Sequence, residues 1–156
     1  KDRVMFKDVM YPPVNFRFEV TMETNKGEYY FSKVSGIEMK LNVTPLPEGG
    51  NNNTVHKLPG ATEYTDLSLH HGLVSTSSSF FIWCQNIIKS DYTNPIVPEK
   101  LLIVRLLDEE DECMVYWEFT NAYPISLKVG DLDAQNQAVL IEELSFTYSE
   151  FERKYP

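Results

Sequence analysis

Residues Ser35–Gly72 read SGIEMKLNVTPLPEGGNNNTVHKLPGATEYTDLSLHHG, and this stretch decides the fold class. Apolar and polar residues alternate over Ile37–Val43 and again over Glu63–His71, which is the period of a half-buried β-strand. Between them, Pro45–Asn53 holds two prolines, two glycines and three asparagines, residues that favour turns. The stretch therefore predicts strands around a hairpin that protrudes at about residues 44–57, with Pro59-Gly60 interrupting the returning chain.

Strand patterns continue on both sides of this stretch. Val14–Met22 alternates strictly, and Tyr29–Val34 returns after a turn at Asn25-Lys26-Gly27. Leu101–Leu107 is nearly all apolar, which indicates a central strand covered on both faces. Asp108–Glu112 is expected to be an acidic hairpin tip, from which Cys113–Thr120 returns as a strand. A kink at Asn121-Ala122-Tyr123-Pro124 is expected to bend this ribbon, which continues through Ile125–Val129. A polar turn region then leads to the last strand, Ala138–Tyr148.

One segment has a helical period instead. Ser77-Ser78-Ser79 offers N-cap hydroxyl groups, and the apolar residues that follow recur at i, i+3, i+4, i+7 and i+8; they are Phe80, Trp83, Cys84, Ile87 and Ile88. This pattern predicts a helix over about residues 78–90. The chain is expected to be mainly β, a β-barrel or two-sheet sandwich with one flanking α-helix, in a single domain over residues 1–156.

Composition narrows the class of protein. The 156 residues include 9 Phe, 9 Tyr and 2 Trp, which is ample apolar material for a core. A net charge of −9 disfavours a nucleic-acid groove and docking on anionic lipid, because both need clustered cations. No apolar run approaches the ~20 residues of a membrane helix. Cys84 and Cys113 have no scaffold or metal spacing, so we expect two buried free thiols and a reducing compartment.

Residues that could perform chemistry are few. Neighbouring strand residues point to opposite faces, so His70 and His71 are expected to be one buried and one exposed residue rather than a metal pair. Asp108–Glu112 lacks the central glycine and the spaced oxygen ligands of a calcium loop. Cys84 lies on the apolar stripe beside Trp83, which suggests a packed thiol rather than a nucleophile. The sequence therefore predicts no enzymatic activity, no metal and no cofactor.

Two stretches, in order along the chain, resemble a known family. The first contains SGIE, PEGGNNNTVHKLPG and TDLSLHHG within Ser35–Gly72; the second contains WEFTNAYPISL, GDLDA and IEELSFTYSEFER within Trp117–Arg153. The opening Tyr11–Val20, YPPVNFRFEV, fits the same family. Together they resemble the tail tube proteins of contractile phages and phage-tail-like injection systems, and the resemblance covers nearly the whole chain.

The resemblance implies a barrel like that of the type VI secretion tube protein. Subunits of this family form six-membered rings that stack into a hollow tube inside a contractile sheath, and contraction drives the tube through a target envelope. The implied partners are other copies of the chain, the sheath protein, a baseplate or spike hub, tube-terminating proteins, and a lumenal cargo or tape-measure protein. Since no signal peptide is visible, assembly is expected in the bacterial cytoplasm, before the tube becomes part of a phage-like particle or injection apparatus.

Two groups of residues are expected to serve such a tube. The hairpin is the candidate ring-to-ring contact, through Pro45, Pro47, Glu48, Gly49, Gly50, Asn51, Asn52 and Asn53. Two polar rows are candidates for the lumen, namely Glu38, Lys40 and Asn42, and Asp66, Ser68 and His70. The alternative function is a monomeric β-barrel that binds a ligand in an apolar cavity.

Overall fold

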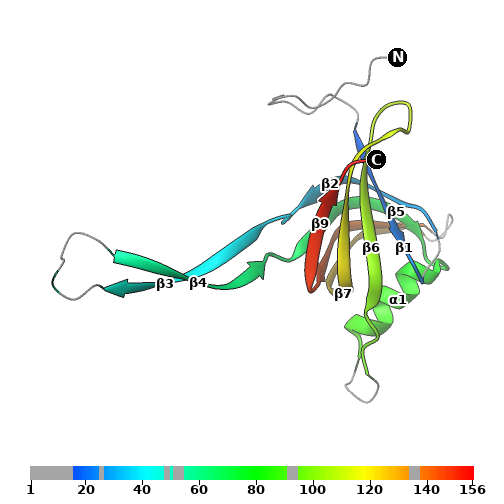
Figure 1. The fold of residues 1–156 in the computed structure, drawn as a ribbon. Coiled ribbons are helices and arrows are strands. Elements are labelled where there is room, and N and C mark those ends of the chain that lie inside the picture. Colours follow the sequence, from blue (N-terminus) through cyan, green and yellow to red (C-terminus); the bar gives the residue numbers. More distant parts are fainter. Residues whose placement is uncertain (1–15, 25–26, 48–49, 51–54, 91–94, 134–137) are drawn as a thin grey trace.

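The computed structural model describes residues 16–24, 27–47, 50, 55–90, 95–133 and 138–156. These residues form a β-barrel with one helix, from which a long two-stranded arm extends (Figure 1). The elements in chain order are β1 (Arg17–Met22), β2 (Tyr29–Ser35), β3 (Met39–Pro47), β4 (Val55–Tyr64), β5 (Leu67–Ser75), α1 (Ser79–Ile88), β6 (Glu99–Leu107), β7 (Cys113–Asp133), β8 (Ala138–Thr147) and β9 (Glu150–Lys154).

The strands of the main sheet follow the order β6-β1-β2-β5-β8-β7-β9, and every adjacent pair is antiparallel. Because β6 also pairs with β7, the first six strands close into a barrel and β9 lies outside it as an extra strand. The predicted mainly-β fold with one helix is confirmed, and it is a barrel rather than a sandwich.

Aromatic and aliphatic side chains fill the barrel. The largest fully buried ones come from six strands and the helix, and they are Phe31, Phe80, Phe119, Phe146, Leu67, Leu69, Leu102, Ile141, Leu144, Val20, Val104 and Val139. The expected central strand β6 buries Leu102 and Val104, whereas Leu101 and Ile103 are only half-buried on its other face. Among the described residues, large buried side chains occupy the interior where the alternative function requires an open apolar cavity, which disfavours that function.

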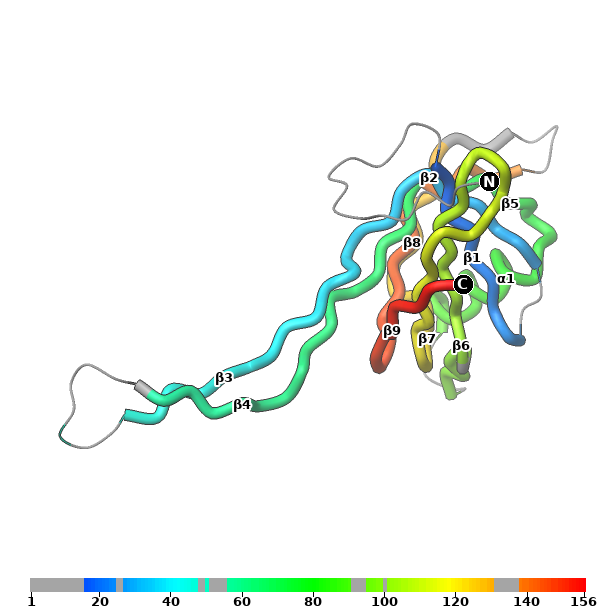
Figure 2. The backbone as a smooth tube through the Cα atoms, turned by 45° about the horizontal axis from the view of Figure 1, so that its top comes forward, coloured from blue at the N-terminus to red at the C-terminus, as the bar shows by residue number. Residues whose placement is uncertain are grey.

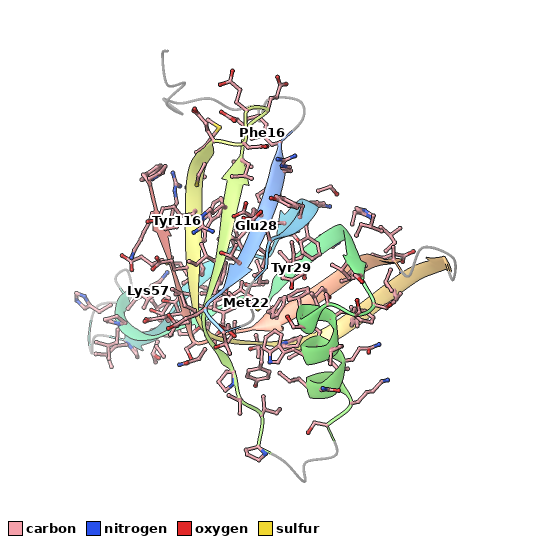
Figure 3. All side chains as sticks on the ribbon, turned by 90° about the vertical axis from the view of Figure 1, so that its right-hand side faces the viewer. Phe16, Met22, Glu28, Tyr29, Lys57 and Tyr116 are labelled. Atoms are coloured by element: carbon pink, nitrogen blue, oxygen red, sulfur yellow. The ribbon has the colours of Figure 1, made fainter. Side chains whose placement is uncertain are left out.

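The helix forms where its apolar period predicted it. Ser78 is the N-cap, and its hydroxyl group accepts a hydrogen bond of 3.1 Å from the backbone N–H of Phe81. Phe80 stacks on Tyr29 with ring centroids 4.4 Å apart, and Figure 3 shows Tyr29 beside α1. Trp83 stacks on Phe146 at 6.2 Å. The helix therefore packs against side chains that β2 and β8 direct into the barrel.

The predicted hairpin is longer than expected, because both strands continue through residues that usually break them. Pro45 pairs with Lys57 and Pro47 with Val55. Two prolines spaced by two residues direct their nitrogen atoms to the same edge of the strand. On an edge strand this can be the edge without a partner strand, where no backbone N–H is needed for pairing. Pro59-Gly60 does not end the returning strand either, since a change of register opposite Asn42 absorbs it as a bulge.

One further expectation is confirmed and one is corrected. The segment from Cys113 to Asp133 is one long strand that bends at Asn121 (φ 54°), which agrees with the predicted kink in a continuing ribbon. The alternation in β5 reverses at His71, which has a φ of 58° and is exposed, while Gly72 points inward in its place. Hence His71 does not share the inward face of Leu67 and Leu69.

Gly72 is required at this bend by packing. A Cβ atom at this position would lie 2.3 Å from the ring of Phe31, which is fully buried.

His70 is half-buried and its ring centroid lies 6.3 Å from that of His71, so the two rings are near one another rather than on opposite faces. Cys84 is buried as expected, whereas Cys113 is only partly buried.

Candidate assembly surfaces

The arm is the most distinctive surface of the molecule. Its strands β3 and β4 pair with each other and not with the barrel sheet, and the arm leads away from the barrel in both Figure 1 and Figure 2. Met39, Leu41 and Val43 are 56%, 52% and 47% exposed. Because strand residues two apart share a face, these three lie with Pro45 and Pro47 on one side of β3, which we name the apolar arm face.

The opposite side of the arm is mixed. Near the barrel it presents Lys40 and Glu63, which are cross-strand partners, and Asn42. Further out it presents Leu46 and Leu58, both about half exposed. The arm thus exposes five large apolar side chains in the isolated subunit, a density that usually marks an interaction surface.

A cluster of contacts fixes the arm to the barrel at its root. The Tyr64 ring, at the end of β4, lies edge-on to Tyr148 at 5.9 Å and to Phe151 at 5.4 Å. The Tyr148 hydroxyl donates a 2.6 Å hydrogen bond to the backbone oxygen of Thr65, and the backbone N–H of Thr65 donates to the oxygen of Glu38 at 3.1 Å. The direction of the arm is therefore set by the barrel.

Two further observations show how tightly the root is packed. Burial, together with the nearby Asp66 and Tyr64, raises the pKa of Tyr148 to about 12. Gly36 has a φ of 83°, and a Cβ atom there would lie 2.0 Å from the backbone oxygen of Asp66. Only glycine fits both the backbone conformation and the space at this turn.

The structure separates the residues that the sequence grouped for assembly. Pro45, Pro47 and Gly50 are exposed in the outer part of the arm, whereas Glu48, Gly49, Asn51, Asn52 and Asn53 lie outside the described residues. Of the two polar rows, Glu38, Lys40 and Asn42 belong to the arm and its root, Asp66 lies between β4 and β5, and Ser68 and His70 lie on the outer face of the barrel. The two rows therefore occupy different parts of the molecule.

Neither cysteine has the surroundings of a reactive thiol. Burial raises the pKa of the Cys84 thiol far above its ordinary value, and it also raises that of Cys113, so neither is an activated nucleophile. Within the described ranges, no group of three or more His, Cys, Asp or Glu side chains could hold a metal ion. A hollow over β7 and β9 is lined by Glu118, Thr120, Glu150, Phe151 and Glu152, and these residues form an open acidic surface rather than an apolar binding pocket.

The acidic segment Asp108–Glu112 is a hairpin tip, as predicted. One Asp108 carboxylate oxygen accepts hydrogen bonds from the backbone N–H groups of Glu110 at 2.8 Å and Glu112 at 2.9 Å. Asp111 forms an ion pair with Arg17. The carboxylate of Asp108 therefore stabilises the turn itself.

Comparison with known proteins identifies the family. The family model described as T4-like virus tail tube protein gp19 matches residues 14–152. The chain belongs to the tail tube protein family. As a tail tube protein, it is a structural subunit of the inner tube of a contractile tail or injection system.

Solved structures agree with this assignment. This tail tube protein is similar to a chain of the extracellular contractile injection system PVC sheath–tube complex in the extended state, with 25% identity and a TM-score of 0.68 over 95% of each chain. It shares its fold with a chain of the anti-feeding prophage tube-terminating cap at 21% identity and a TM-score of 0.69, covering 95% of this chain and 94% of that one. A type six secretion system protein has the same fold at 9% identity and a TM-score of 0.54, over 90% and 84% of the two chains. A search of curated proteins finds no match.

The apolar arm face is the feature that sequence reasoning missed. The alternation of Met39, Leu41 and Val43 with polar residues predicts a half-buried strand, whereas in the structure about half of each of these side chains is exposed. The sequence signal for a separate hairpin is the presence of Pro45 and Pro47 in one strand and Pro59 in its partner. A proline has no backbone N–H to donate, so it is tolerated only in edge strands or at bulges.

Proposed function

We propose that six copies of this tail tube protein close into a ring and that the rings stack into a hollow tube inside a contractile sheath. The observation that carries this proposal is the apolar arm face. A two-stranded hairpin alone is marginally stable in water, and its outer edges present unpaired backbone groups. Another subunit that packs against the arm would cover the apolar arm face and the open strand edges. The arm therefore has the form of an assembly element.

Charge supports a second copy of the chain as the partner of the arm. A ring of six would carry −54, six times the −9 of one chain, so the net charges of two copies repel each other. Between residues 39 and 64, however, Lys40 and Lys57 balance Glu48 and Glu63. The arm therefore carries no net charge and can lie against an acidic neighbour without net repulsion.

The fixed root supports a closed ring. A head-to-tail interface closes into a ring only when the rotation between neighbours is the same at each step. The contacts of Tyr64 with Tyr148 and Phe151 give the arm one direction relative to the barrel. We assign the outer arm, Pro45–Asn53, to contact between rings, which stacking requires in addition to the contact within a ring.

The remaining partners follow from the same assembly. The proposed partners are a sheath protein, a baseplate or spike hub, tube-terminating proteins, and a cargo or tape-measure protein in the lumen. The similar chains named above come from a sheath–tube complex and a tube-terminating cap, which supports the first and third of these. The described part of the chain contains no helix long and apolar enough to span a bilayer. We further propose that the subunit performs no covalent chemistry and assembles in the cytoplasm.

Electron microscopy of the purified chain tests the proposal. Above a threshold concentration we expect six-fold rings and short hollow tubes, and a variant lacking Gly49–Asn53 should fold and form rings but give shorter tubes. Unchanged tube length in this variant would show that the inter-ring assignment is wrong.

A further inference from the structure

The arm combines features that make a free β-hairpin prone to pair with copies of itself. Among the described residues, β3 and β4 pair only with each other, so each strand has one edge without a partner. The arm exposes about half of each of the side chains of Met39, Leu41 and Val43, and residues 39–64 carry no net charge. Open strand edges that are apolar and uncharged are prone to edge-to-edge aggregation.

The three prolines of the arm all lie in cross-strand pairs of one kind. Partners in an antiparallel pair alternate between those that exchange two backbone hydrogen bonds and those that exchange none. The pairs that contain the prolines follow one another at intervals of two residues, and they are Val43–Pro59, Pro45–Lys57 and Pro47–Val55. All three therefore belong to the same class. Because a proline has no N–H to exchange, this is the class without hydrogen bonds.

The hydrogen-bonded pairs lie between these pairs, and they are Thr44–Leu58 and Leu46–His56. Residues of the other class direct both backbone groups away from the partner strand and towards the open edge. On the outer part of β3, three positions face the open edge in this way. Two of them are prolines, Pro45 and Pro47, and the third is Val43.

Both open edges of the outer arm are therefore poor templates for another strand. On β3, a strand that pairs with the edge would lose one of two hydrogen bonds at Pro45 and again at Pro47, since neither can donate. On β4, Pro59 faces the edge in the same orientation, and the neighbouring position of the same class is Lys57. Proline and lysine both discourage pairing at strand edges.

A bulge interrupts the arm nearer the barrel. The register shifts between the pairs Leu41–Thr62 and Val43–Pro59, where β4 has one residue more than β3. Gly60 lies in this bulge, and a Cβ atom there would lie 3.1 Å from the backbone oxygen of Asn42. A bulge increases the local twist, which turns the edge away from a second strand. Features that oppose edge pairing thus follow one another from Pro47 to the bulge.

We propose that Pro45, Pro47 and Pro59 guard the arm of the free subunit against β-pairing with the arms of other copies. Contact through the arm is thereby left to the apolar arm face. On β3, proline removes the backbone donor and remains apolar, whereas a charged guard would place its charge on that face beside Val43. The guard acts on the subunit before assembly, so it does not depend on the geometry of the proposed ring.

The double variant Pro45→Thr and Pro47→Thr tests the guard, because threonine restores both N–H groups and favours strands. Thr44→Ile is the matched control, since it adds apolar surface and strand propensity to β3 but its N–H already faces β4. The full chain is kept below the concentration at which tubes form, and thioflavin T fluorescence is followed over time. We expect the double variant to give at least about fivefold more signal than the parent, and Thr44→Ile to stay within about twofold of it.

Hydrogen exchange shows where the aggregated subunits are joined. Edge pairing should slow exchange of the backbone N–H groups over residues 43–47 and leave the protection of β5 and β8 unchanged. Aggregation through an unfolded barrel would instead remove the protection of β5 and β8, and this result would overturn the proposal. An unchanged thioflavin T signal in the double variant, or an equal rise in Thr44→Ile, would also overturn it.

A second set of variants addresses the edge of β4. Pro59→Thr restores an N–H there while Lys57 remains, so we expect a smaller rise in thioflavin T signal than in the double variant of β3. Combining Pro59→Thr with Lys57→Thr should bring the signal close to that of the β3 variant. If the combined variant behaves like the parent, Pro59 is no guard and its assignment is wrong.

Discussion

Replacing Leu41 with serine tests whether the apolar arm face is an assembly interface. Leu41 is 52% exposed in the isolated subunit, so about half of its apolar surface can still be buried. Full burial of a leucine side chain contributes about 1.5–3 kcal/mol, and the exposed half therefore contributes about 0.8–1.5 kcal/mol when a neighbour covers it. Each added subunit brings one arm, so the association constant per subunit should fall about 4- to 13-fold.

The double variant Leu41→Ser and Val43→Ser should lower the same constant roughly 10- to 100-fold, because both side chains lie on the apolar arm face. Folding should be spared, since neither side chain belongs to the buried core. The assay is the concentration at which tubes first pellet, with the melting temperature measured in parallel. Thr44→Ser, a small change on the opposite side of the same strand, is the matched control.

We expect the pelleting concentration to rise for Leu41→Ser and for the double variant, and to stay unchanged for Thr44→Ser. All melting temperatures should lie within a few degrees of the parent. An unchanged threshold in the double variant would refute the reasoning, because half-exposed apolar side chains at a real interface cannot be removed without cost. An equal effect of Thr44→Ser would also refute it, since assembly would then respond to any change in β3.

The remaining predictions concern the barrel that carries these surfaces. Gly72→Ala should lower the melting temperature by about 4–8 °C, because the added methyl group overlaps the buried Phe31 ring and overpacking of this kind costs about 2 kcal/mol; a melting temperature equal to that of the parent would contradict the packing. Phe80→Asp should unfold the subunit, as it places a charge in the core, while Ile82→Asp on the exposed side of α1 should cost about 1 kcal/mol or less by chemical denaturation. Stability should decline as pH rises from 10 towards 12, because Tyr148 keeps its proton in the folded state after the unfolded chain has lost it, and Tyr148→Phe should flatten that decline in urea titrations.

The local periods of the sequence were sufficient for most of the barrel. A period of two in Val14–Met22 and a period of 3.6 after Ser78 each predict an element that the structure contains. These predictions succeed because the inward face of each element is packed against others, and burial imposes the period. The whole-chain resemblance then gave the family, which the match over residues 14–152 confirms.

The bends were not predictable from period alone. The bend at Asn121 is predicted by residue type, in the stretch Asn121-Ala122-Tyr123-Pro124, whereas the positive φ of His71, which reverses the alternation of β5, is not. Such residues respond to the closure of the barrel, in which strands must bend together. The inward position of Gly72 against Phe31 depends on two strands at once, and no pattern within one strand reveals it.

The assembly surfaces were only partly predictable for a related reason. Whether the apolar residues Met39, Leu41 and Val43 face a core or a partner depends on where the hairpin leaves the barrel. That point is fixed by Gly36 and by the aromatic contacts of Tyr64, which join residues far apart in the sequence. Likewise, Ser68 was recognised as a polar strand residue, but its place in a row of four serines appears only when the register of four strands is known.

The most direct test of the account is an electron cryomicroscopy reconstruction of tubes formed by the purified chain. The account predicts stacked six-fold rings around a central channel, in which each apolar arm face packs against another subunit. Subunits that remain monomeric at every concentration and salt condition, or tubes whose arms lie free in solvent, would contradict it.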